Sequence, residues 1–159
     1  MVLNWKILVQ APEAESRVVA ATTIPRFYWR VAPAREEWVL HFAVNQTEIT
    51  PKFLESDGFV FIGVEQGVVA VNATTGAIVA EVTDTSYVQA IELTASGQVL
   101  VSGETEMIGF DASSGSLLWR TPLPDAIETF EEMAGQVTVH SVDGATFVLN
   151  LITGKPARR

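Results

Sequence analysis

A six-residue pattern that recurs at a fixed interval constrains this chain more than any other feature. Residues 71–76, 110–115 and 149–154 each place Asn or Asp second and Gly last, so the three glycines lie 39 residues apart, twice over. The Asn or Asp side chain can accept a hydrogen bond from the backbone two residues further on, which closes a turn. Glycine takes the positive φ that strains other residues. The pattern therefore indicates an array of repeated units.

Each unit holds four short segments rich in β-branched and aromatic residues, separated by turn residues. A period near 40 residues with four strands per unit is typical of propeller blades. We therefore expect one all-β domain with almost no helix, a β-propeller-like array of three to four four-stranded blades. The expected units are 49–87, 88–126 and 127–159, and the clearest strands are 59–64, 67–72, 98–103, 106–111, 136–141 and 146–150.

Residues 1–48 lack the repeat glycines, and three prolines interrupt them. Four apolar segments nevertheless fall roughly where four strands belong. They begin near Ile7, Arg17, Arg26 and Trp38. This stretch is either a degenerate first blade or an unrelated cap.

One copy of the repeat resembles a known family. The stretch Gly109-x-Asp111-x-x-x-Gly115-x-x-x-Trp119 is similar to the docking motif of quinoprotein-type (PQQ-type) propeller repeats. In the other two copies Gly76 and Gly154 remain, but Ala80 and Arg158 stand where the Trp belongs. The resemblance covers about residues 49–159 and implies that Trp119 packs between neighbouring blades.

The resemblance also bears on cofactors. Enzymes of that family hold the quinone with a calcium ion, flanking Trp residues and adjacent cysteines, in a ring that usually has eight blades. This chain has no cysteine and half that number of blades, so we expect no cofactor.

Charge narrows the range of partners. The net charge is −9, and residues 41–154 carry fifteen acids against two bases, Lys52 and Arg120. Such a body repels nucleic acid and favours a basic protein partner. No apolar run is long enough to span a bilayer. No secretory signal is recognisable at the N-terminus, so the expected location is the cytoplasm.

The sequence offers no convincing catalytic group. His140, Ser141 and Asp143 could suggest a nucleophile with its base, but neighbours on a strand point to opposite faces. His41 lies near two glutamates without the spacing of a metal site. We therefore expect no enzyme activity and no metal.

If strands run outward from the propeller axis, one set of loops shares a face. Those loops contain six acids and no Lys or Arg: Glu65, Asp84, Glu104, Glu106, Asp125 and Asp143. They form the candidate binding surface of a non-catalytic module, for example a cytoplasmic inhibitor or immunity-type protein that neutralises a basic partner. The alternatives are a carbohydrate binder or hydrolase with its site on the propeller axis, and a scaffold subunit of a larger assembly.

The small number of units determines how many chains are needed to close a propeller ring. Propellers avoid exposed sheet edges by closing into a ring of four to eight blades. Three to four units make at most the smallest ring, so two copies forming a homodimer could complete a larger one. The alternatives are a four-bladed monomer and an open half-ring with capped ends.

Overall fold

The computed structural model describes residues 2–13 and 17–157, which form strands and turns and contain no helix. The strands form four sheets, numbered here in chain order. Sheet 2 contains β5 (Lys52–Ser56), β6 (Phe59–Val64), β7 (Gly67–Asn72) and β8 (Ile78–Val82). Sheet 3 contains β9 (Val88–Leu93), β10 (Gln98–Gly103), β11 (Glu106–Asp111) and β12 (Leu117–Pro122). Sheet 4 contains β13 (Ile127–Met133), β14 (Gln136–Ser141) and β15 (Thr146–Asn150).

Sheets 2, 3 and 4 are sequential antiparallel meanders, and all six strands expected from the repeat have the predicted bounds. Sheet 4 has three strands within the described residues, one fewer than the expected four-stranded blade. Beyond β15 the backbone returns to it, because Ala157 N donates to Val148 O over 2.8 Å. The predicted all-β propeller-like array is therefore confirmed.

Sheet 1 is built differently. It contains β1 (Leu3–Leu8), β2 (Val18–Ala20), β3 (Phe27–Pro33) and β4 (Leu40–Val44), in the spatial order β1-β3-β4-β2. Strand β2 runs parallel to β4. The N-terminal residues thus supply a fourth four-stranded sheet whose topology differs from that of the repeats.

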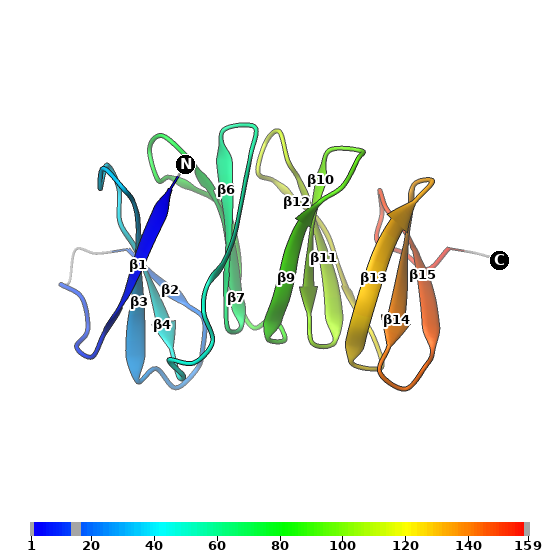
Figure 1. Ribbon diagram of the computed structural model, residues 1–159, viewed down its shortest axis with the longest axis horizontal. Helices are drawn as coiled ribbons and strands as arrows, with labels where there is room; N and C mark the ends of the chain where they lie inside the picture. Colours follow the sequence, from blue (N-terminus) through cyan, green and yellow to red (C-terminus); the bar gives the residue numbers. More distant parts are fainter. Residues whose placement is uncertain (1, 14–16, 158–159) are drawn as a thin grey trace.

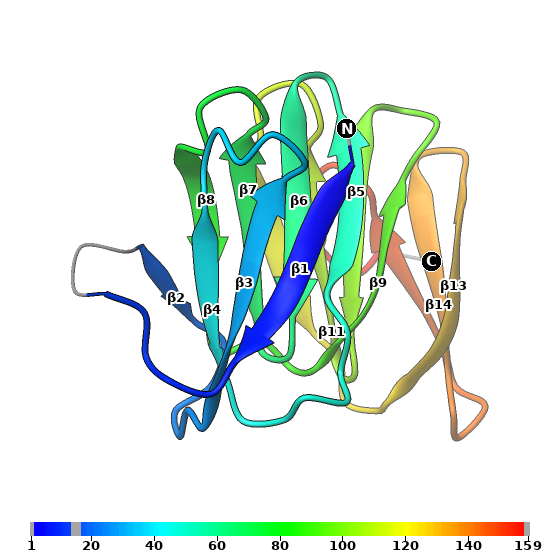
Figure 2. The same cartoon turned by 60° about the vertical axis from the view of Figure 1, so that its left-hand side comes forward.

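The four sheets stand side by side in an open row, with sheets 1 and 4 at opposite ends (Figures 1 and 2). An apolar cluster fills each of the three junctions. The middle sheets are covered on both faces, so β6 and β7 read as nearly continuous buried runs. Strand β14 of the end sheet instead alternates between buried and more exposed positions, as expected for a sheet with one free face. Among residues 2–13 and 17–157 no helix could cross a membrane.

Candidate functional site

The repeated turns are equivalent in detail. Gly76, Gly115 and Gly154 have φ values of +70°, +70° and +65°. Each glycine N–H donates to the carbonyl of the Asn or Asp four residues before it, over 2.8–2.9 Å. That Asn or Asp side chain accepts the backbone N–H groups two and three residues further on. The turn mechanism predicted from the sequence is therefore confirmed.

Trp119 lies against the last of these turns. It is 7% exposed, and its Nε1–H donates to Leu151 O over 2.7 Å. A Cβ added at Gly154 would lie 2.5 Å from the indole carbon Cε3. The indole of sheet 3 thus occupies the space that the glycine of the next turn leaves open.

Trp38 docks in the same way at the first junction. It is 7% exposed, and its Nε1–H donates to Ala73 O over 2.9 Å. A Cβ at Gly76 would overlap the indole of Trp38. The sequence motif does not predict this role for Trp38, because Arg30 and Ala34 stand where the motif has Asp and Gly.

The middle turn receives a different side chain. Ala80 occupies the motif's Trp position, and a Cβ added at Gly115 would lie 2.9 Å from Cδ1 of Phe59. Phe59 comes from the start of β6, and its ring has no polar hydrogen. Each repeat glycine therefore faces an aromatic ring of the preceding sheet.

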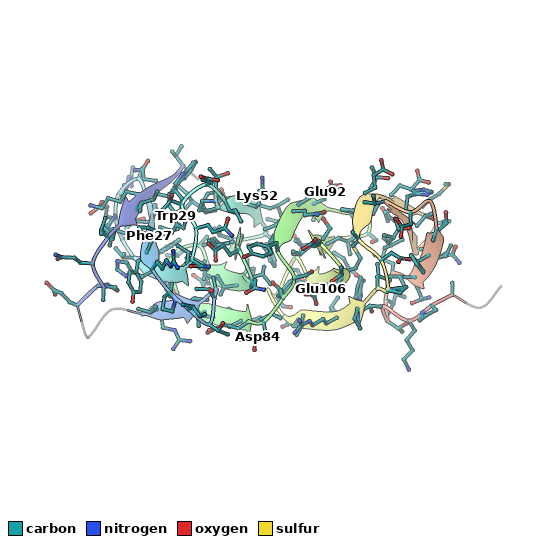
Figure 3. All side chains as sticks on the ribbon, turned by 90° about the horizontal axis from the view of Figure 1, so that it is seen from below. Phe27, Trp29, Lys52, Asp84, Glu92 and Glu106 are labelled. Carbon is teal, nitrogen blue, oxygen red and sulfur yellow. The ribbon has the colours of Figure 1, made fainter. Side chains whose placement is uncertain are left out.

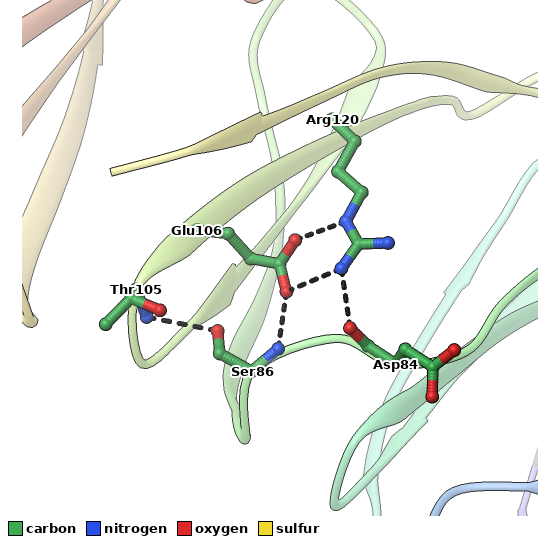
Figure 4. Close-up of polar contacts among 5 residues, drawn as sticks. All are labelled: Asp84, Ser86, Thr105, Glu106 and Arg120. Atoms are coloured by element: carbon green, nitrogen blue, oxygen red, sulfur yellow. Dashed lines mark hydrogen bonds and ion pairs between the residues drawn. The ribbon is translucent and has the colours of Figure 1, made fainter. Parts of the chain in front are cut away.

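Two of the six candidate binding acids are internal, which corrects the expectation that all six are displayed on the surface. Glu106 is 4% exposed. Its carboxylate accepts Ser86 N and pairs with the Arg120 guanidinium, which also donates to Asp84 O over 2.7 Å (Figure 4). These contacts of Glu106 and Arg120 connect β11 and β12 to the linker between sheets 2 and 3. Glu106 therefore does not contribute to the binding surface, because its charge is neutralised by Arg120 inside this junction.

Glu65 is the second internal acid, at 1% exposure. Its carboxylate accepts the backbone N–H groups of Asn45 and Gln46 over 2.6–3.0 Å. Those residues begin the linker between sheets 1 and 2. Glu65, in the β6–β7 turn, and Glu106, at the start of β11, thus each bind backbone N–H groups of the linker that leads into their own sheet.

The other four candidate acids do lie on one edge. Asp84, Glu104 and Asp143 are exposed and Asp125 is half-buried. Their loops contact one another, because Thr105 N donates to Ser86 Oγ in the linker that carries Asp84, over 3.0 Å. Ile127 N likewise donates to Glu104 O and Val142 N to Ala126 O, over 2.8 and 2.9 Å. We call these four residues the acidic edge. It lies along the bottom of Figure 1 and faces the viewer in Figure 3, where Asp84 is labelled.

The histidines do not assemble a catalytic group. Ser141 is buried and its hydroxyl bonds within its own turn, whereas His140 is directed to the other face, 3.9 Å from Glu131. His41 is 7% exposed, and burial, followed by the nearby Arg30 charge, lowers its pKa. Within the part of the chain that the structure describes, no three His, Asp or Glu side chains come together as metal ligands.

The repeated blades, their glycine turns and the docked indoles define a propeller module of PQQ-type repeats. A family model described as outer membrane protein assembly factor BamB matches residues 29–157, so the chain belongs to this PQQ-type repeat family. No curated protein matches the chain significantly.

Solved structures agree on the fold. BamB from Moraxella catarrhalis is 18% identical with a TM-score of 0.51, over 99% of this chain and 51% of that one. The computationally designed Ika4 protein is 14% identical with a TM-score of 0.52, over 91% and 96% of the two chains. The designed Ika8 protein is 15% identical with a TM-score of 0.54, over 82% and 42%. This chain therefore spans about half the length of BamB.

Proposed function

We propose that this chain is a non-catalytic propeller module that binds a basic protein through the acidic edge. The observation that carries the proposal is an uncompensated line of carboxylates on adjoining loops. Arg120 lies beside Asp84, but its guanidinium is already bound to Glu106 and to Asp84 O. The acids of the edge therefore present their negative field to solvent.

Such a field acts mainly on the rate of association. Complementary charge steers a partner before contact and can raise the on-rate by about 10- to 1,000-fold at low salt. The specific form that we propose is a cytoplasmic inhibitor or immunity-type protein that masks the basic surface of an enzyme. It would need no catalytic residue of its own.

The test is a matched pair of triple variants. A tagged chain isolates partners from the native host, and association of the identified partner is then measured against salt. Asp84→Asn, Glu104→Gln and Asp143→Asn together should slow association about tenfold or more and flatten its salt dependence. The control removes three exposed acids from elsewhere, Glu37→Gln, Asp57→Asn and Glu131→Gln. Equal association rates for the two triple variants would contradict the proposal.

The family match favours a second function, that of a scaffold subunit. BamB is described as an assembly factor for outer membrane proteins. In that case this chain would hold several partners at once. Two or more partner proteins that bind at the same time, of which only one associates more slowly with the acidic-edge triple variant, would favour the scaffold.

A further inference from the structure

A polar cleft separates the first strands of sheets 3 and 4, with a volume of about 330 Å³. Its walls come from β9, β10 and β13. The lining residues are Gln89, Ala90, Glu92, Ser102, Ile127, Glu128, Thr129 and Phe130. The lining thus includes two glutamates, Ser102 and Thr129, and no basic residue.

The two carboxylates come from opposite walls. Strand pairing places Ala90 opposite Ser102 and Glu92 opposite Leu100, so these side chains share the face of sheet 3 that looks towards sheet 4. Glu128 stands on β13 at a bulge in its pairing with β14. Both glutamates are exposed, and Figure 3 shows Glu92 on the side of the row opposite Asp84.

Ser102 is a second, independent sign of a ligand. It is 3% exposed and lines the cleft, yet its hydroxyl makes no hydrogen bond with any residue that the structure describes. Buried hydroxyls are normally satisfied. A polar group entering the cleft would supply the missing partner.

The preceding junction shows that the cleft is not a general feature of the repeat. Gly63 stands there in place of Ser102, and a Cβ added to it would lie 2.6 Å from Cγ1 of Val88. Phe53 and Gln89 occupy the positions of Glu92 and Glu128, 39 residues earlier. Packing thus closes one junction, whereas carboxylates line the next.

One end of the cleft, at Ser102 and Ile127, lies next to Glu104 of the acidic edge. Ser102 is two residues from Glu104, and Ile127, which lines the cleft, donates its N–H to Glu104 O over 2.8 Å. A partner lying along the edge could therefore extend one side chain between the two sheets.

We propose that this cleft receives a lysine or arginine side chain of the partner. The inference rests on the proposed function and locates an anchor within that interface. A guanidinium or ammonium group donates charge-assisted hydrogen bonds to Glu92 and Glu128 and a further one to the Ser102 hydroxyl. No covalent step is involved.

The probe is the peptide acetyl-Gly-Arg-Gly-amide, titrated into the full chain labelled with ¹⁵N and followed by NMR. Saturable shifts should centre on the amides of Gln89, Ser102 and Thr129. The same peptide with uncharged citrulline should not produce them. Glu92→Gln with Glu128→Gln should weaken binding about tenfold or more, the effect of losing charged hydrogen bonds. Glu131→Gln is the control on the same strand, because that side chain lies beside His140.

Shifts that do not saturate, or that leave the cleft amides unmoved, would overturn the inference. So would an unchanged affinity in the Glu92→Gln, Glu128→Gln variant. The proposed function is judged separately by the partner's association with the acidic-edge variant. If that variant loses association while the cleft variant retains it, only the cleft inference fails.

Discussion

Two tryptophans at opposite ends of the row solve the same packing problem from different sequence contexts. Trp119 follows the family motif and docks on the turn at Gly154, whereas Trp38 follows no such motif and docks on the turn at Gly76. Both indole N–H groups donate to the carbonyl of the residue just after the turn's Asn, Leu151 in one case and Ala73 in the other. The docking site is therefore a property of the glycine turn.

The middle junction sharpens this conclusion. Gly115 has the same φ and the same turn hydrogen bonds, but its neighbour is the ring of Phe59. A ring against a bare glycine is common to all three junctions, and the indole hydrogen bond belongs to the outer two. Packing is thus the shared requirement, and the hydrogen bond adds to it where a Trp is present.

The largest expected effect comes from removing either indole. Trp119→Ala and Trp38→Ala should each destabilise the protein by about 3–5 kcal/mol, since both delete a buried ring and leave a cavity. Urea unfolding followed by circular dichroism measures the loss. Trp119→Phe and Trp38→Phe serve as controls, because they retain a ring and should recover most of the stability. A parent-like midpoint for Trp38→Ala alone would break the equivalence of the two sites.

A smaller loss should follow from changing the glycines instead. Gly154→Ala and Gly76→Ala place a methyl group against an indole at positive φ, at a cost of about 2–4 kcal/mol. Gly135→Ala is the matched control. It also has positive φ, +77°, but no atom lies within 4 Å of the added Cβ, so it should carry the backbone strain alone. Similar losses in all three variants would show that docking contributes little.

Features that depend on short-range hydrogen bonds could be predicted from the sequence, and features that depend on contacts distant in the sequence could not. The turns could be predicted because the bonds that make them lie within six residues, as from Asn72 to Ala77. The partner of Trp38 is 35 residues away, and no local pattern specifies such a contact. The order of sheet 1 was equally inaccessible, since it depends on the parallel pairing of β2 with β4.

The buried acids show the same limit. Glu65 lies in the β6–β7 turn and Glu106 directly follows the β10–β11 turn. Acids at such positions are normally solvated, so the sequence indicated a surface position for both. Their actual partners are backbone N–H groups 19–20 residues away and Arg120, 14 residues from Glu106. One available signal was that Arg120 is the only base between residues 53 and 154. A lone base in an acidic body should have a fixed partner.

The smallest expected effect distinguishes the three turns by pH. Asp111 holds the position that Asn72 and Asn150 hold in the other two, and hydrogen bonds from the Ser113 and then the Ser114 hydroxyl lower the pKa of its carboxyl from 3.8. A lowered pKa in the folded state stabilises the fold at pH values above 3.8, and this contribution is lost as the pH falls through the folded value. Asp111→Asn removes the titration. The stability of the parent relative to this variant should therefore be constant near neutral pH and decline below about pH 4. Urea midpoints of both proteins between pH 7 and pH 3 measure the difference.

The reverse change, Asn150→Asp, should introduce the same acid-dependent loss at the turn beneath Trp119, because Thr153 Oγ1 there already donates to the Asn150 side chain. A gap between parent and Asp111→Asn that stays constant down to pH 3 would mean that the serine hydroxyls do not favour the charged carboxylate, and that the three turns are alike in energy as well as in geometry.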